Sequence, residues 1–394
     1  IKPPIQIVDN GFREKSVIYF LKWLLPGLLL LEVIQFISWS SVGTYTSILD
    51  AFLNIANVYN EAQNITFEDG LPIISKILTL FGAFTRIAII LGLYYFKQLS
   101  KLSRIIFILF INVFLGFTIM YYGSVKNVGD IAIYAASISY LKFKIHNDKK
   151  FLRMSIVAVL LLTMFFGYVQ YSRLENNNWA GGEFTSPAYI DYDHVLFKAI
   201  DFRLAKTITL MSGYLSHGYY GLSLCLKLPF VWTYGVGNSF ALSQLLSHYF
   251  NVENVMYNTY PLRMESTTGW PALLYWSTIF TWLASDFTFI GALIFLSLLA
   301  VVWGRTWKES ISCQNPLSIV LFSHLNIMWL FVPANNQLMQ TVESTISTIV
   351  LFLIWILFHR KFNAEVSVNN LPTYFGEGKH ANAKAERISQ STSN

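Results

Sequence analysis

Long apolar runs constrain the fold of this chain more than any other feature. Runs of spanning length lie near residues 17–39, 71–95, 105–122, 155–170, 286–303, 316–332 and 343–359. A helix of about 20 apolar residues crosses the hydrocarbon core of a bilayer. Only 13% of the residues are charged, whereas soluble domains carry about a quarter. The sequence therefore predicts an all-α, polytopic integral membrane protein.

Two further apolar segments are shorter. A basic cluster follows the run 131–141 at once, so we expect this run to span as a short or tilted helix. It brings the expected number of transmembrane helices to about eight or more. The segment 271–284 lies too close to the next span to cross, which is typical of an interfacial or re-entrant helix.

The distribution of Lys and Arg predicts the orientation. Five connectors hold 18 of the 28 basic residues: 1–16, 96–104, 142–153, 304–309 and 359–394. The connectors 40–70 and 333–342, on the opposite side, hold none. Basic connectors face the cytoplasm. The long polar segment 171–275 is therefore one large extracytoplasmic loop.

This pattern predicts four regions along the chain. They are an N-terminal group of transmembrane helices (1–170), the large outer loop with amphipathic helices (171–285), C-terminal transmembrane helices (286–360) and a disordered cytoplasmic tail (361–394). The chain opens without Met in what reads as a cytoplasmic connector, so we expect an N-terminal part with further spans to precede it.

The first amphipathic segment of the loop is 195–211. Its apolar residues Phe197, Leu204 and Ile208 share one helical face, whereas Lys198 and Lys206 lie on the opposite arc. Such a helix lies at the outer leaflet. It serves either as a membrane anchor or as a basic platform for a diphosphate-bearing lipid.

The next segment, 212–223, is rich in glycine and tyrosine and holds His217. Its glycines disfavour a stable helix. His217 is either a general base for a sugar hydroxyl or a residue that holds the loop by hydrogen bonding. An unbroken helix would separate it from Arg203 by ~21 Å. Both can be catalytic only if the chain bends at 212–213.

The pattern Tyr234-Gly235-Val-Gly237-Asn-Ser239 predicts a tight turn whose exposed backbone N–H groups form an anion-binding nest. Arg263, in the segment 260–267, suits a diphosphate because its planar fork makes paired hydrogen bonds. The alternative is an ion pair with Glu265. Asp286, at the outer end of a span, is either a substrate-binding group or a helix N-cap.

Four charges lie at or within spans. Lys126 is the only basic residue in a short outer connector, and we expect it to reach the same lipid phosphate. Glu32, Lys76 and Arg86 are intramembrane charges, and Arg86 needs a partner or a cavity. Glu32 is one expected partner.

Other classes of site are absent from the sequence. The loop has no HExxH motif and no DxD pair, so we expect neither a metal nor a cofactor. The net charge of +6 lies in segments that flank the spans, so we expect lipid contact and no nucleic-acid partner.

Three motifs together resemble the Wzy-type O-antigen polymerases, the bacterial enzymes that polymerise oligosaccharide repeat units. They are the run 213–224 around His217, the run Trp232–Ser239, and Leu283-Ala-Ser-Asp286-Phe followed by Gly291. Thr288 departs from the family pattern, which has glycine after Asp-Phe. The resemblance implies a GT-C-like architecture in the bacterial inner membrane.

The resemblance also implies a reaction and its partners. A growing glycan would move from undecaprenyl diphosphate to a lipid-linked repeat unit, with a chain-length regulator as a further partner. Arg203 or Arg263 would stabilise the departing diphosphate, and His217 would act on the acceptor hydroxyl. Sugar-stacking residues would be the loop aromatics Tyr214, Tyr219, Tyr220, Trp232, Tyr234 and Trp270.

Three other functions stay open from the residues alone. An O-antigen ligase differs only in its acceptor. A flippase or sugar permease would show internal repeats and polar residues near the midplane of several spans, whereas the polar residues here concentrate in the outer loop. A scaffold protein is the third.

Overall fold

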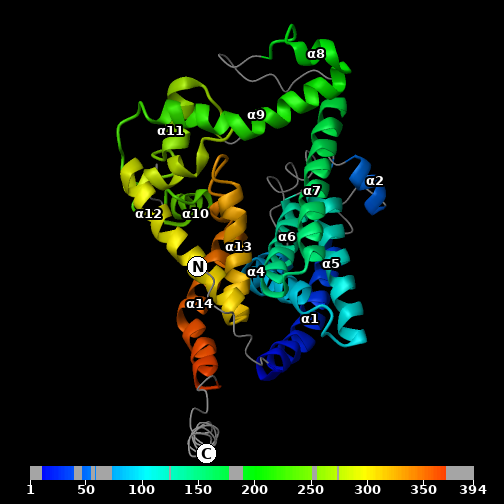
Figure 1. The fold of residues 1–394 in the computed structure, drawn as a ribbon. Coiled ribbons are helices and arrows are strands. Elements are labelled where there is room, and N and C mark those ends of the chain that lie inside the picture. The colour runs from blue at the N-terminus through cyan, green and yellow to red at the C-terminus, as the bar shows by residue number, and fades with distance from the viewer. Residues whose placement is uncertain are drawn as a thin grey trace, which may run out of the picture.

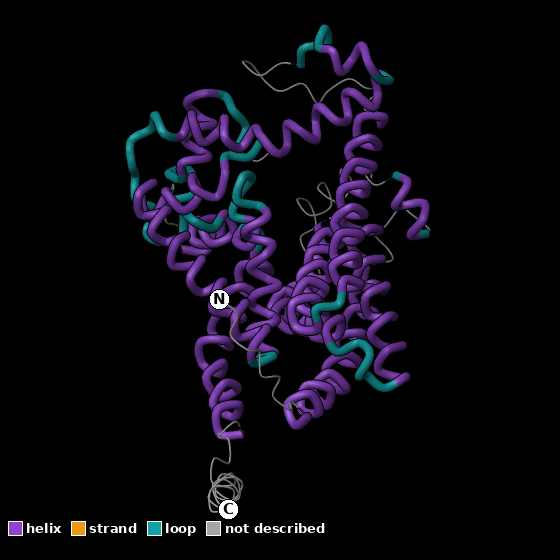
Figure 2. Tube along the Cα trace, in the orientation of Figure 1, coloured by secondary structure: helices purple, strands orange, loops and turns teal. Residues whose placement is uncertain are grey.

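The computed structural model describes residues 11–39, 47–54, 58, 73–123, 126–176, 190–250, 255–272 and 275–369. Figure 2 shows that these residues form helices joined by short loops, with no strand among them. Within this described part the structure confirms the all-helical prediction.

The helices of the first half are α1 (Gly11–Trp39), α2 (Ile48–Leu53), α4 (Ile73–Tyr94), α5 (Lys101–Tyr122), α6 (Lys126–His146) and α7 (Lys149–Asn176). The predicted outer loop, called the outer segment below, holds α8 (Val195–Ala199), α9 (Phe202–Cys225), α10 (Phe240–Phe250) and α11 (Tyr260–Thr268). The last part holds α12 (Thr278–Ser312), α13 (Pro316–Leu330), the 3₁₀ turn η1 (Gln337–Met339) and α14 (Val342–Asn369).

Among the residues that the structure describes, six helices are long and apolar enough to cross a membrane. They lie within α1, α4, α5, α7, α12 and α14. Helix α13 is apolar but shorter, with 15 residues. Length and composition therefore support a multi-pass membrane protein.

Local sequence sets the ends of these helices. Ser100 starts α5 by accepting a hydrogen bond from the Ser103 N–H, and Gly123 ends it in the left-handed conformation with φ 54°. Asn315 starts α13 in the same way, followed by proline at the first helical position. Local capping residues therefore fix where these two helices begin.

The helices form two groups that α9 joins at the top of the view in Figure 1. One group holds α1, α2, α4, α5, α6 and α7, and the other holds α10 to α14. Helix α9 lies across them, packed on α7 at one end and on α11 and α12 at the other. A buried apolar core with residues from α1, α4, α6, α12, α13 and α14 connects the groups lower down.

The amphipathic segment 195–211 differs from the prediction of one helix. The chain breaks at Ile200, which is extended with φ −135° and ψ 170°, and Asp201 starts α9 by accepting hydrogen bonds from two backbone N–H groups. Lys206 is buried near the ring of Tyr192, at 5.8 Å, and does not lie on an exposed polar arc. Leu204 is exposed, as a face that meets lipid requires.

Two boundaries also differ from the sequence prediction. Residues 278–287 form a short helix that the break at Thr288 separates from the following span, whereas the sequence predicted this separate helix over 271–284. Helix α14 continues to Asn369, past the predicted start of the tail at 361. The remaining tail, 370–394, lies outside the described residues.

Candidate functional site

The carboxylate of Asp286 fills the turn formed by residues 233–238. Its Oδ1 accepts hydrogen bonds from Thr233 Oγ1 at 2.6 Å, Gly235 N at 2.9 Å and Gly237 N at 3.2 Å, and its Oδ2 accepts two from Asn238, N at 2.7 Å and Nδ2 at 2.8 Å. The predicted nest for an anion therefore exists, but the protein's own carboxylate occupies it. The turn and Asp286 act as a latch between the outer segment and α12.

The latch is also hydrogen-bonded to the connector between α13 and α14. Ser239 donates a hydrogen bond to the Met339 carbonyl at 2.7 Å, and Asn336 Nδ2 donates one to the Asn238 carbonyl at 2.8 Å. Gly235 has φ 82°, a conformation that glycine adopts without steric cost. Gly235, Gly237 and Ser239 thus shape the fold at this position.

Thr288 interrupts α12 two residues after the latch. Its φ of 63° and ψ of 169° lie in a region that almost only glycine occupies. This explains physically why glycine is the residue expected after Asp-Phe. The alternative reading of Asp286 as a helix N-cap is wrong, because its carboxylate accepts from the turn 233–238.

Arg263 projects from α11 toward the chain that leaves α9. Its Nη2 donates to the Pro229 carbonyl at 2.7 Å, and its guanidinium lies 4.9 Å from the centre of the Tyr260 ring. Its Nε makes no hydrogen bond among the described residues. Glu265 accepts a hydrogen bond from the Ala272 N–H at 3.2 Å, and no ion pair joins it to Arg263 in the part of the chain that the structure describes.

Exposed aromatic side chains follow the carbonyl that Arg263 binds. Phe230, Trp232 and Tyr234 are all exposed, and the rings of Trp232 and Tyr234 lie 5.0 Å apart. The latch fixes the backbone at Tyr234 through Gly235. Arg263 thus holds the chain just before these exposed rings, and we call this part of the segment the Arg263 surface.

His217 is packed inside the outer segment. Its ring lies 5.7 Å from that of Tyr275 and 5.3 Å from that of Trp276, and only 6% of the residue is exposed. Burial lowers the pKa of His217 to about 4. The imidazole is therefore neutral at pH 7, and as a base it is weak and enclosed by rings.

The glycines around His217 do not break the helix, contrary to the prediction. A Cβ at Gly218 would clash with the Pro333 carbonyl oxygen, and one at Gly221 would lie 2.7 Å from the Trp276 carbonyl oxygen. These glycines let α9 pack directly on backbone. Tyr219 is exposed, whereas Tyr220 packs 4.8 Å from the ring of Trp270.

The predicted site residues fall into three places: a packed unit around α9, α11 and α12, the start of α9, and the start of α6, which holds Lys126. His217, Arg263, Asp286 and the turn 233–239 belong to one packed unit around α9, α11 and α12. Arg203 lies at the exposed start of α9, which is helical from Phe202 to Cys225. No bend at 212–213 brings Arg203 to His217, so the two lie ~21 Å apart along the axis.

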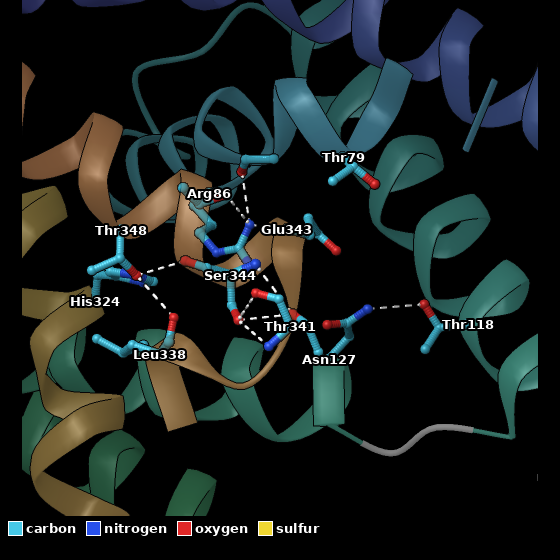
Figure 3. Close-up of polar contacts among 12 residues, drawn as sticks. Thr79, Arg86, Thr118, Asn127, His324, Leu338, Thr341, Glu343, Ser344 and Thr348 are labelled. Carbon is cyan, nitrogen blue, oxygen red and sulfur yellow. Dashed lines mark hydrogen bonds and ion pairs between the residues drawn. The ribbon is translucent and has the colours of Figure 1, made fainter. Parts of the chain in front are cut away.

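A polar cluster within the helices escaped the sequence prediction (Figure 3). Arg86 Nη1 on α4 forms an ion pair with Glu343 Oε1 on α14 at 2.8 Å. The same nitrogen donates to Ser347 Oγ at 2.8 Å and the Gly82 carbonyl at 3.0 Å. The partner of Arg86 is therefore Glu343, and Glu32 makes no hydrogen bond with it among the described residues.

A small pocket opens beside this ion pair. Its polar lining comes from Thr85, Arg86, Asn127, Asp130, Tyr134 and Glu343. Lys126, the predicted phosphate-binding residue, begins α6 one turn before Asp130 and attracts its carboxylate electrostatically. Lys126 thus lies near Arg86 and in a different unit from Arg263.

Further polar groups continue from the pocket into the core. The Tyr134 hydroxyl lies 3.1 Å from His324 Nδ1, and His324 Nε2 lies 3.0 Å from Thr348 Oγ1. Asn326 Nδ2 donates to Ser137 Oγ at 2.8 Å. The expectation that the polar chemistry lies in the outer loop alone is therefore wrong.

Searches against protein-family models, curated proteins and solved structures found no match to this chain.

Proposed function

We propose that this protein polymerises undecaprenyl-diphosphate-linked oligosaccharide repeat units into a polysaccharide at the outer face of the bacterial inner membrane. In this proposal α6 and α13 also span, which gives eight spans and a GT-C-like architecture. The motif resemblance favours this reaction. Helices long enough to span a membrane put the protein in the same bilayer that both lipid-linked substrates occupy.

The Arg263 surface carries the proposal. A sugar diphosphate combines a doubly charged group with apolar ring faces. Arg263 binds the Pro229 carbonyl, and the exposed rings of Trp232 and Tyr234 follow shortly after it in the chain. The Nε of Arg263 has no hydrogen-bond partner among the described residues but is buried, so a phosphate would bind the other N–H groups of the guanidinium. Hydrogen bonds between guanidinium and phosphate are charge-assisted and often paired.

In the transfer step the acceptor hydroxyl oxygen attacks the anomeric carbon of the donor. The bond from that carbon to the diphosphate oxygen breaks, and the electron pair leaves with the diphosphate. Arg263 stabilises this charge, a contribution typically worth about 10² to 10³ in rate. Positioning of the two lipid-linked substrates supplies much of the remainder.

The acceptor proton needs a base, for which His217 remains a prediction. Its ring would have to leave its place against Tyr275 and Trp276 to reach a sugar. Asp286 is a weaker candidate because donors already surround both of its oxygens.

The test is a glycan ladder. The full-length protein and its Arg263→Ala, Arg263→Lys and Arg203→Ala variants are expressed in a strain that lacks its own polymerase but makes the matching repeat unit. We expect a ladder in wild type and Arg203→Ala, a single repeat in Arg263→Ala, and partial recovery in Arg263→Lys. Lys227→Ala, an exposed basic residue on the same segment, is the matched control.

Each outcome assigns the function differently. A ladder that survives Arg263→Ala at equal protein abundance removes Arg263 from the site but keeps the reaction. Full-length glycan that stays unattached in the deletion strain assigns a ligase.

The buried polar cluster favours a second candidate, a flippase of lipid-linked sugars. Charged and polar groups on α4, α6, α13 and α14 meet inside the helical core, and such groups mark transport pathways in membranes. Repeat units trapped on the cytoplasmic face of a deletion strain would favour this function over polymerisation.

A further inference from the structure

The pocket beside Arg86 lacks one positive charge. Arg86 forms an ion pair with Glu343, with 2.8 Å between Nη1 and Oε1, so its charge is already neutralised. Asp130 also lines the pocket, is only 8% exposed, and makes no hydrogen bond among the described residues. A buried carboxylate without hydrogen bonds is costly unless it is neutralised.

Neighbouring groups do not remove this deficit. Lys126 attracts Asp130 but is only half-buried, at the end of α6, where solvent screens it. Glu32, on α1, adds a third carboxyl group that Glu343 repels electrostatically. One Oε of Glu32 is buried and has no hydrogen-bond partner in the described part of the chain. Arg86, the one cation that lines the pocket, is thus paired with Glu343, and the lining offers no second cation to Asp130.

The lining supplies oxygen atoms for a small cation. Asn127 turns its Nδ2 toward Thr118 Oγ1, at 3.2 Å, so its Oδ1 is available for another contact. Thr85, Tyr134 and the second carboxylate oxygen of Glu343 contribute further oxygens. Hard cations prefer such ligands. The free space holds roughly one water-sized species.

The pocket lies near the starts of α6 and α14 and beside the middle of α4. Asp130 is in the second turn of α6, and Glu343 is in the first turn of α14. Both helices begin at connectors on the side opposite to the basic clusters. A cation therefore enters from the outer face.

We propose that this pocket binds one monovalent cation, a proton or a sodium ion, and that Asp130 is the group that carries it. A proton would bind a carboxylate oxygen of Asp130 directly, and a sodium ion would lie between Asp130 and the neighbouring oxygens. The inference holds whether the protein polymerises glycans or moves them, because it rests on the helical core.

The test is thermal unfolding of the purified full-length protein in detergent at constant ionic strength. Sodium chloride is compared with potassium and choline chloride at fixed pH, and pH is then varied without sodium. A saturable rise of the unfolding midpoint with sodium alone assigns a sodium site. The site binds a proton if sodium has no effect and the unfolding midpoint of wild type depends on pH more steeply than that of Asp130→Asn, by the equivalent of one bound proton.

Variants separate Asp130 from its neighbours. Asp130→Asn is expected to abolish the cation response, whereas the exposed Asp193→Asn should leave it unchanged. Asn127→Ala is expected to weaken sodium binding at least about tenfold and to leave a proton response intact.

Three results would overturn the proposal. They are a wild-type midpoint that responds to neither ion, a response that Asp130→Asn retains, and a response that Asp193→Asn removes. If Asp130→Asn does not fold, the wild-type titration and Asn127→Ala still decide between the two ions. A protonated carboxylic acid band in the infrared spectrum, lost in Asp130→Asn, checks the proton arm directly.

Discussion

Asn238 binds the carboxylate of Asp286 with two groups, its backbone N–H at 2.7 Å and its side-chain amide at 2.8 Å. This pair joins residues 48 positions apart. It fastens the outer segment to α12 immediately before the break at Thr288. The Arg263 surface depends on this latch for its shape.

Replacing Asp286 with Asn should release the latch. The new amide would present N–H donors to groups that are themselves donors, and each charge-assisted hydrogen bond contributes about 1.5 to 3 kcal/mol. We expect a loss of at least about 2 kcal/mol in the free energy of unfolding and faster amide exchange over 233–238. Exposed Asp193→Asn is the control, and unchanged exchange in the turn would refute the latch.

Thr288→Gly should stabilise the protein. Backbone strain of about 1 to 3 kcal/mol disappears, while glycine costs roughly 0.5 to 1 kcal/mol in chain entropy. The expected net gain is about 1 kcal/mol in thermal or denaturant unfolding. Thr288→Val keeps a β-branched side chain in the strained conformation and should show no gain in stability. Equal stability of Thr288→Gly and Thr288→Val would contradict the claim that the backbone at Thr288 is strained.

Acidification should weaken the protein through His217. Its pKa is about 4 in the folded protein and about 6.5 when unfolded. Between these values only the unfolded chain binds the proton, so stability is full above roughly pH 6.5 and falls as pH drops toward 4.

The check is the unfolding midpoint of wild type and His217→Phe from roughly pH 7.5 to pH 4.5. We expect a flatter pH dependence in the variant, because Phe fits the aromatic surroundings and does not titrate. Exposed His146→Gln should keep the wild-type slope. Parallel curves for wild type and His217→Phe would show that this ring does not govern the acid response.

Gly218→Ala should disrupt the packing of α9. The new methyl group would meet the Pro333 carbonyl oxygen, a backbone atom that cannot rotate away. Overpacking of this kind costs about 1 to 3 kcal/mol or more. Gly304→Ala is a helical control with open space around the new Cβ, and it should be neutral or slightly stabilising in thermal unfolding.

Glu343→Gln should leave Arg86 without its ionic partner. Fully buried pairs lose about 3 to 5 kcal/mol when one partner is removed. The Glu343 side chain is 41% exposed, so we expect a smaller loss. Arg86→Met combined with Glu343→Gln should recover part of it in a double-mutant cycle. Strictly additive losses would show that the pair is not coupled.

Local patterns predicted the spans and their order because apolar length and basic flanks are properties of short segments. The Gly235 turn was likewise predicted from its own residues. What fills that turn could not be, since Asp286 lies 51 positions away. The ion pair between Arg86 and Glu343 joins residues 257 positions apart, and no helical spacing reveals it.

The glycines of α9 show where local helix propensity leads to a wrong prediction. Their low helix propensity predicted that the segment 212–223 would not form a stable helix, but tertiary packing decides the outcome. Gly218 and Gly221 lie against backbone of the connectors before α12 and after α13, where any side chain would clash. Propensity alone does not contain that information.

Helix α9 meets both helical groups, α7 near its start and α12 near its end. A helix of 24 residues keeps a nearly constant length of about 36 Å. It therefore acts as a strut between α7 and α12, in addition to the direct packing of α4 on α14 and of α6 on α13. Any movement that parts the two groups must rotate this strut about its contacts or unwind it at Asp201, its first hydrogen-bonded cap.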